Sequence, residues 1–261
     1  MKLSVLIPCH RRLDLLHRAL ASVQDWPVLV VDDSVDGLDL GDVPSCRTEG
    51  QVGFAAAVNL GLEQLEAQGY SHVLLLNDDA VPAPGCVDAL ARAWSAQDGA
   101  LAPMLVEPTG QISSGFVVRR TGRIRVRPGA VLEPTPVDAV SGAAMLIRAS
   151  ERLDAHYRHG FEDLDLCRRL KIRGLSIRTL PIRCEHTGGG TVSRSSRLAQ
   201  AAALSGHLRY IGGGWRSGFA VALSLGQVLR EGASPSRLLG VLDGCRDHRR
   251  RAHCSAAAPD S

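Results

Sequence analysis

Acidic and amide side chains directly follow two apolar stretches near the start of the chain. They are Asp32 and Asp33 after residues 27–31, and Asn77, Asp78 and Asp79 after residues 72–76. Mg²⁺ or Mn²⁺ takes one or two protein oxygen ligands and completes its shell with phosphates and water, so residues 77–79 suggest a metal site. The earlier pair can accept hydrogen bonds from a nucleobase or a ribose. For that pair a solvated turn remains an open alternative.

A third group of acids lies at residues 162–165, where a helix is expected to begin. Its members are Glu162, Asp163 and Asp165. Acids at a helix start complement the helix dipole, which accounts for at least one of them. A carboxylate that faces a pocket can also take the proton from an attacking hydroxyl group. Arg168 and Arg169 follow within the helix, where either one can form an ion pair instead.

His186 lies beside three consecutive glycines at residues 188–190. A neutral imidazole is a good ligand for a divalent ion, and glycines let the backbone approach a diphosphate closely. A lone histidine is more often structural, so both interpretations stay open. Gly142 begins a run of small residues inside residues 137–147, which we interpret as a strand. Small residues there leave room for a sugar, although a close-packed strand crossing is the favoured interpretation when the run is taken alone.

The elements that must position these groups alternate between strand and helix. Strands are expected over residues 2–7, 27–31 and 72–76, and helices over residues 12–23, 54–68 and 84–94. This alternation predicts an α/β sheet of parallel strands joined by right-handed crossovers, with helices on both faces. Ligands of such sheets bind beyond the carboxyl ends of the strands, where the acidic groups lie.

The rest of the chain has a different pattern. Short strands are expected over residues 100–106, 112–119, 124–127, 137–147 and 176–180, with a helix over residues 163–173 and helical structure from residue 195 onward. A length of 261 residues fits one large domain or a domain with a tail. We therefore predict a catalytic domain over residues 1–195 and a helical extension over residues 196–261 with a basic, frayed end.

Composition excludes several classes of function. A net charge of +3 and an aromatic content of 4% argue against nucleic-acid binding. Seven cysteines, an odd number without Cys-x-x-Cys spacing, favour a reducing cytoplasm. The N-terminus lacks the pattern of a signal peptide, and no stretch reaches the ~20 apolar residues that span a bilayer. The segment 198–251 has two open interpretations, a cap over the sheet or a peripheral contact with a membrane.

Seven segments, taken in order, resemble family 2 glycosyltransferases of the GT-A fold, and especially their rhamnosyltransferase-like branch. They are VLIPCHRR at 5–12, VLVVDDS at 28–34, GFAAAVNLGL at 53–62, LLLNDDAVP at 74–82, VSGAAMLIR at 140–148, GFEDLDLCRRL at 160–170 and HTGGGT at 186–191. No single motif is decisive, but seven in order are specific. The resemblance implies a Rossmann-like, mainly parallel central sheet flanked by helices.

The resemblance also implies a donor site. Asp33 is expected to contact the nucleotide base, with Pro8 and His10 lining that pocket, and Gly53 and Asn59 are expected beside the nucleotide. The loop after Asp33 departs from the family pattern, reading DDSVDG where many members have DDGSTDG. The base and the sugar therefore stay open, with dTDP- and UDP-linked donors both compatible.

Metal and catalytic residues follow from the same resemblance. Residues 77–79 match the DxD region, so Asp79 is expected to hold Mg²⁺ or Mn²⁺ with His186 as a late ligand. Asn77 replaces the first acid of that motif, which predicts weaker metal affinity. Asp163 matches the catalytic base, with Glu162 supporting it or contacting the acceptor.

The expected activity is transfer of a hexosyl or deoxyhexosyl group, with inversion, from a nucleotide-diphosphate sugar to an acceptor hydroxyl. The acceptor is a glycan, a lipid-linked group or a small molecule, in cell-surface polysaccharide or glycoconjugate synthesis. Three alternatives remain from the residues. An NAD-dependent oxidoreductase is less favoured, because no G-x-G-x-x-G follows the first strand. A nucleotidyltransferase would normally carry a glycine-rich basic loop after its first strand, which PCHRRLD lacks. A non-catalytic sugar-binding relative would not need the acids.

Overall fold

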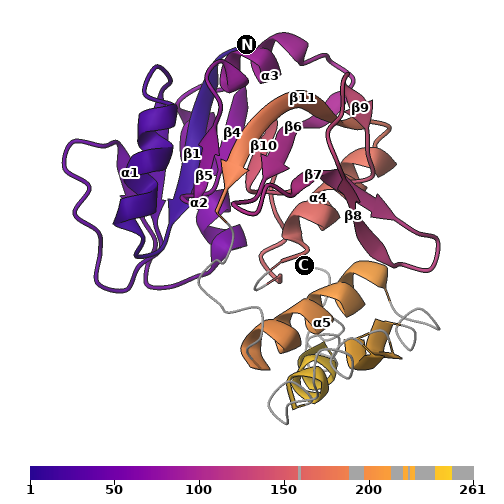
Figure 1. Ribbon diagram of the computed structural model, residues 1–261. Coiled ribbons are helices and arrows are strands. Elements are labelled where there is room, and N and C mark those ends of the chain that lie inside the picture. The colour runs from indigo at the N-terminus through magenta and orange to yellow at the C-terminus, as the bar shows by residue number, and fades with distance from the viewer. Residues whose placement is uncertain (158–159, 188–196, 213–219, 223, 227–238, 249–261) are drawn as a thin grey trace. The chain divides into compact units, whose positions relative to one another are not determined.

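The computed structural model describes residues 1–157, 160–187, 197–212, 220–222, 224–226 and 239–248 (Figure 1). The chain forms two compact units. The first comprises residues 1–118, 124–156 and 162–188, and the second comprises residues 119–123, 157–161 and 189–261. The predicted boundary between residues 195 and 196, like the glycines at 188–190, lies outside the described residues.

The described strands form one mixed sheet in the first unit. They are β1 (Leu3–Cys9), β2 (Val28–Asp32), β3 (Ser45–Arg47), β4 (His72–Leu76), β5 (Ala80–Pro82), β6 (Asp98–Val106), β7 (Ile112–Val118), β8 (Ile124–Pro128), β9 (Thr135–Pro136), β10 (Ala144–Arg148) and β11 (Ser176–His186). The central order is β3-β2-β1-β4-β10-β6-β11-β5. Strands β1 to β4 are parallel, as are β6 and β11, whereas β10 runs antiparallel to both of its neighbours.

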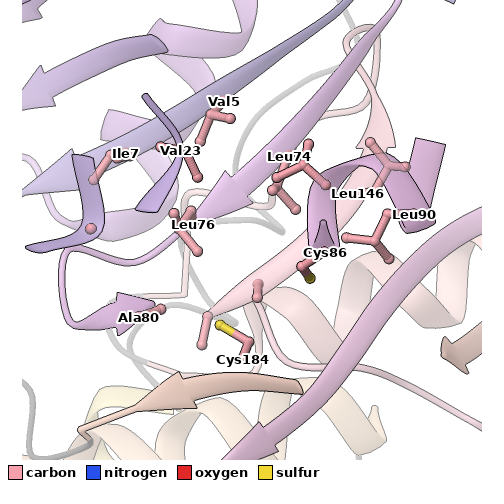
Figure 2. Close-up of a cluster of buried hydrophobic side chains, with 14 of the residues drawn as sticks. Val5, Ile7, Val23, Leu74, Leu76, Ala80, Cys86, Leu90, Leu146 and Cys184 are labelled. Atoms are coloured by element: carbon pink, nitrogen blue, oxygen red, sulfur yellow. The ribbon is translucent and has the colours of Figure 1, made fainter. Parts of the chain in front are cut away.

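Helices cover both faces of this sheet, as the alternation of strands and helices predicts. They are α1 (Leu13–Ser22), α2 (Phe54–Ala67), α3 (Cys86–Ala93) and α4 (Glu162–Ile172). On one face, α1 and α3 pack against alternate residues of the central strands in a core that includes Val5, Ile7, Leu74 and Leu146 (Figure 2). Because successive strand residues point to opposite faces, Leu6 faces the other side, where α2 covers it.

Helix α2 approaches the sheet so closely that one of its positions has no room for a side chain. A Cβ atom added at Gly61 would lie 2.3 Å from Leu6 Cδ1 and 2.8 Å from Val31 Cγ2. The helix ends before Gly69, whose φ of 79° is the left-handed conformation that glycine adopts easily. The absence of a side chain at Gly61 therefore lets α2 pack directly against β1 and β2.

Two predicted strands differ from the structure by more than two residues at one end. Residues 137–147 do not form one strand, because the chain turns at Gly142 and Ala143 and only β10 follows. Strand β11 does not end at residue 180 but continues to His186, since a register shift between Leu180 and Arg183 accommodates Pro181. The short strands β3, β5 and β9 are too brief to show a periodic pattern, and the sequence did not predict them.

The second unit contains helix α5 (Arg197–Ile211), which packs on two short segments from elsewhere in the chain. The ring of His207 stacks on Phe161 with centroids 5.4 Å apart, and its Nε2 lies 2.9 Å from the carbonyl oxygen of Gly122. Phe161 has a left-handed φ of 77°. None of the described helices combines the length and the apolar character needed to cross a bilayer.

Candidate functional site

The topology brings the predicted site residues to one edge of the sheet. Strands β1, β2 and β4 are parallel, so the segments that follow them emerge together. Strand β10 is antiparallel to β4, with Ala144 opposite Leu76, so its beginning lies at that edge. Strand β6 is antiparallel to β10 and parallel to β11, so the end of β11 lies there too.

Asp33 is buried after β2, and its carboxylate secures the loop that follows β3. Its Oδ1 accepts hydrogen bonds from the Thr48 hydroxyl at 2.9 Å and the Val52 amide at 2.8 Å, while Oδ2 accepts one from the Gly53 amide at 3.0 Å. A carboxylate oxygen can accept two hydrogen bonds, so Oδ2 retains capacity for one more donor. Nδ1 of His10 lies 2.8 Å from the main-chain oxygen of Asp33, which joins the ends of β1 and β2.

Asp32 has a structural role. Its carboxylate accepts hydrogen bonds from the amide and the hydroxyl of Ser34 and from the amide of Leu38. Burial by itself raises the pKa of Asp32, but these hydrogen bonds and nearby Arg47 outweigh it and lower the pKa. The turn interpretation therefore accounts for Asp32, whereas Asp33 keeps an open acceptor position.

The other residues expected near the nucleotide lie on three elements. Pro8 is buried in β1 opposite Val31 of β2. Gly53 precedes α2 with a φ of 91°. The side-chain amide of Asn59 exchanges two hydrogen bonds with the backbone of Leu153, of 2.9 and 2.8 Å. In this structure Asn59 therefore anchors residue 153, and its contact with a nucleotide stays a prediction.

Residues 77–79 form the link between β4 and β5. The main-chain amide of Asn77 donates a 2.9 Å hydrogen bond to the carbonyl oxygen of Ala143. This bond joins the link to the turn before β10. Burial, together with the charge of Asp79, raises the pKa of Asp78, although Cys9 and Arg12 act in the opposite direction. Asp78 thus lies against the end of β1.

Asp79 faces His186. Residue His186 is paired with Ala80 across β11 and β5, and its Nε2 lies 3.2 Å from Oδ1 of Asp79. This distance is within ion-pair range, although the geometry is not that of a regular hydrogen bond. Burial alone raises the pKa of Asp79, but the facing imidazole and the charge of Arg12 outweigh it and lower the pKa. The structure thus brings together the two residues expected to bind a metal.

The donor atoms of this group suit a hard divalent ion. Two buried oxygens, Oδ1 of Asn77 and Oδ1 of Asp79, accept no hydrogen bond from any residue that the structure describes. Buried oxygens without donors are costly unless a ligand satisfies them. Within the described ranges, no three His, Cys, Asp or Glu side chains converge as a ready metal cage. The residues therefore fit an ion that takes two protein ligands and completes its shell from a diphosphate and water, as Mg²⁺ does.

Asp163 lies at the first turn of α4, beside the turn before β10. Its Oδ2 accepts a 2.9 Å hydrogen bond from the Gly142 amide, and its Oδ1 accepts a 2.7 Å bond from the Leu164 amide. Burial raises the pKa of Asp163 despite these hydrogen bonds. A Cβ atom added at Gly142 would lie 3.5 Å from the Asp163 Cβ, an ordinary van der Waals contact, so the main-chain amide and not the missing side chain is what holds Asp163 here. The Gly142 amide thus holds the Asp163 carboxylate. Gly142 lies in a turn and not within a strand, although the sequence predicted a strand there.

The other acids in the first turn of α4 are Glu162 and Asp165. Asp165 is buried and forms ion pairs of 2.6 Å with Arg168 and 2.9 Å with Arg169, as helix spacing allows. Glu162 is buried at the start of α4. The ion pairs account for Asp165 as a structural residue, whereas Asp163 forms no ion pair with a described residue and is held by two backbone amides.

Two residues that sequence reasoning did not assign contribute to the site. Arg12 lies close enough to Asp78 and Asp79 to influence the pKa of both, and Arg11 before it has a left-handed φ of 74°. Thr48 holds Asp33 through its hydroxyl. The basic pair after β1 was a visible signal for Arg12, whereas nothing in the sequence around Thr48 indicated its contact.

Comparisons with known proteins complete this picture. Among solved structures, the chain is similar to A197 from STIV, with 13% identity, a TM-score of 0.48, and coverage of 72% of this chain and 87% of that chain. It is similar to a putative glucose-1-phosphate thymidylyltransferase from Bacillus anthracis, with 13% identity, a TM-score of 0.43, and coverage of 72% and 88%. Likeness at this level assigns no activity. A search of curated proteins gave no match.

The decisive comparison is with a family model. The model described as glycosyl transferase family 2 matches residues 4–153, which include β1 to β10 and the link with Asp79. The mixed α/β sheet agrees with the expected GT-A fold. The comparison does not extend to the rhamnosyltransferase-like branch, which stays a prediction. The chain belongs to glycosyl transferase family 2.

Proposed function

We propose that this family member transfers a hexosyl or deoxyhexosyl group, with inversion, from a nucleotide-diphosphate sugar to an acceptor hydroxyl, in the synthesis of a cell-surface polysaccharide or glycoconjugate. The observation that carries the proposal is the shared edge of the sheet, where Asp79 faces His186 and where Asp163 is bonded to the turn before β10. Those residues would supply the two groups that such a transfer needs, a support for the leaving diphosphate and a base for the acceptor.

The nucleotide would bind beyond the ends of β1 and β2. The remaining acceptor position on Asp33 Oδ2 suits an N–H group of a base, and His10 holds the Asp33 backbone in place. Pro8 and Gly53 shape the same corner, and Asn59 supports it from α2. Either a dTDP- or a UDP-linked donor satisfies this arrangement.

Asp79 and His186 would hold Mg²⁺ or Mn²⁺, with Asn77 and Asp78 beside them. When bound, the ion supplies Lewis-acid neutralisation of the negative charge on the departing diphosphate. Arg12 contributes a fixed positive charge on the same side, since it already acts on both Asp78 and Asp79. The ion and Arg12 together would place positive charge where a leaving group becomes more negative.

Asp163 would accept the proton of the acceptor hydroxyl as that oxygen attacks the anomeric carbon. A raised pKa makes its carboxylate a stronger base than an ordinary aspartate, and the Gly142 and Leu164 amides orient it. Glu162 lies next to it at the start of α4, in a position to support the base or to contact the acceptor. The acceptor itself, a glycan, a lipid-linked group or a small molecule, is an expectation from the family.

The test is a panel of nucleotide sugars incubated with the full chain and Mg²⁺ or Mn²⁺, with release of the nucleotide diphosphate as the signal. We expect hydrolysis of one donor class and faster release when an acceptor is added. The same chain incubated with sugar phosphates and nucleoside triphosphates should give no pyrophosphate. Pyrophosphate release would indicate a nucleotidyltransferase, and sugar binding without donor turnover would indicate a non-catalytic relative, so either result contradicts the proposal.

A further inference from the structure

The strands β7 and β8 form a hairpin that is rich in arginine and contains no acid. Residues 108–132 contain five arginines and no acid, whereas the whole chain has a net charge of only +3. We call residues 112–128 the arginine hairpin. Its arginines are Arg119, Arg120, Arg123, Arg125 and Arg127.

These side chains are available to a partner. Arg119, Arg120, Arg123 and Arg125 are exposed, and Arg127 is half-buried. None of the five forms an ion pair with a residue in the described part of the chain. Asp138 is an acid that contacts the hairpin. Its carboxylate accepts a hydrogen bond from the Val118 main-chain amide and forms an ion pair with Lys171. The positive charge of the hairpin is therefore not neutralised by its described surroundings.

The shape of the hairpin spreads these charges instead of gathering them into a pocket. Strand β8 pairs only with β7 among the described strands, so its outer edge is open. Arg125 and Arg127 lie two residues apart on that edge strand, which separates them by about 7 Å along it. A site for one free phosphate needs donors that converge, whereas separated arginines suit a flat surface that presents many phosphates.

Exposed aliphatic side chains accompany the arginines. Val126 lies between Arg125 and Arg127 in the sequence, so its side chain is on the opposite face of β8, where it keeps 45% of its surface exposed, and Leu132 beyond the strand is 95% exposed. If the open edge of β8 meets a lipid surface, both faces come to it, so the arginines would reach headgroup phosphates and the aliphatic groups would reach acyl chains. Single-stranded nucleic acid would call for exposed aromatic rings, and the only aromatic residue of the hairpin, Phe116, is half-buried.

We propose that the arginine hairpin docks the protein on an anionic phospholipid surface. The hairpin also has a smaller structural role. Its charged residues and Pro128 discourage another strand from pairing with the open edge of β8. That role needs one or two charges and does not require five arginines without an acid among them. The proposal does not depend on the transfer reaction, so each can fail without the other.

The experiment is flotation of the full chain with vesicles of phosphatidylcholine alone or mixed with phosphatidylglycerol, at low and high salt. The double variant Arg120→Gln/Arg125→Gln removes two hairpin charges. The matched control Arg92→Gln/Arg183→Gln removes two exposed arginines elsewhere and leaves the same net charge. We expect binding only to the mixed vesicles, weakened by salt, and about 30-fold weaker for the hairpin variant if each arginine contributes about 1 kcal/mol.

Three outcomes would overturn the proposal. One is no binding of the full chain to the mixed vesicles at low salt. Another is equal weakening by the hairpin and control variants, which would reflect diffuse charge. The third is displacement from vesicles by soluble inorganic phosphate or by single-stranded RNA at matched ionic strength, because either would identify a different ligand for the same arginines.

Discussion

The main-chain amide of Gly142 donates a 2.9 Å hydrogen bond to Oδ2 of Asp163. This bond joins the turn before β10 to the first turn of α4, two segments that are twenty-one residues apart in the sequence. Because the neighbouring residue Ala143 accepts the amide of Asn77, the carboxylate and the β4–β5 link are connected through one short turn. The candidate base and the link that carries Asp79 are therefore joined to the same short turn of backbone.

Replacing Asp163 with asparagine tests the base. We expect Asp163→Asn to lower the turnover number by about 10²- to 10⁴-fold, since the amide cannot accept the proton, while donor binding stays near wild type. Steady-state kinetics and nucleotide titration measure the two quantities. Asp165→Asn is the control, because its ion pairs with Arg168 and Arg169 are structural and the folded fraction should keep its activity. Wild-type turnover in Asp163→Asn would refute the assignment.

The raised pKa of Asp163 predicts how activity depends on pH. A base works when it is deprotonated, so kcat/KM should rise with pH through a pKa above the ordinary aspartate value of about 4. Between the unfolded and the raised folded pKa, the native state holds more protons, so this group makes stability fall as pH rises. Asp163→Asn should therefore lose less stability with rising pH than wild type. An acid limb of the same midpoint in the folded Asp163→Asn variant would argue against the assignment.

Metal dependence tests the pair of Asp79 and His186. Each of Asp79→Asn and His186→Ala should raise the Mn²⁺ concentration for half-maximal donor hydrolysis at least tenfold, which is the low end of what losing even an indirect metal contact costs. Binding of Mn²⁺ in the presence of nucleotide diphosphate can be measured directly, without activity. Glu185→Gln is the matched control, because Glu185 is exposed and neighbours His186 on β11. Unchanged Mn²⁺ affinity in both site variants would remove the metal proposal.

Asp98 predicts how the fold responds to acid. Burial raises its pKa, but hydrogen bonds from Arg178, Ser176 and Ser95 outweigh it and lower the pKa of Asp98 to about 2. A lowered carboxyl pKa contributes stability above the unfolded value, and that contribution is lost as pH falls from about 4 toward 2. Asp98→Asn should cost about 3–5 kcal/mol at neutral pH because it leaves Arg178 without its buried partner. Urea denaturation at several pH values measures both effects, and a loss that stays constant down to pH 2 would contradict the linkage.

Gly61 predicts the tightness of the α2–sheet contact. Gly61→Ala would place a methyl group against Leu6 and Val31, so we expect a loss of roughly 1–3 kcal/mol from overpacking. Gly226→Ala is the control, since a Cβ atom at that helical position would meet nothing within 4 Å. The control should be neutral or slightly stabilising, because alanine favours helix. Equal urea midpoints for the two variants would show that the contact is not tight.

The sequence predicted the first half of the fold well because its signals were local. Residues 72–76 form β4 at the predicted bounds, and α2 begins at Phe54 as expected. Apolar runs and helical spacing depend only on neighbouring residues. The antiparallel insertion of β10 between β4 and β6 depends on pairing between distant segments, and no short pattern encodes it.

The candidate site was predictable in its residue types and less so in their contacts. The juxtaposition of Asp79 and His186 agrees with the sequence-based expectation, while their binding of a metal stays a prediction. Asn59 contacts Leu153, a partner ninety-four residues away that no spacing rule identifies. Gly142 was interpreted as a strand residue because its apolar neighbours are typical of a strand. In the structure Gly142 lies in a turn, and its amide donates a hydrogen bond to Asp163.

His186 belongs to a strand, and this has a consequence for ligand affinity. Because β11 continues past its register shift and pairs His186 with Ala80, the residue next to Asp79, folding itself restricts both side chains to one small region. A ligand that binds there has little backbone freedom left to remove, so the entropic penalty of assembling its site is met before it arrives. Insertion of one residue between Arg183 and His186 would turn the imidazole to the opposite face of the strand. The two side chains would then no longer be held together before a ligand binds.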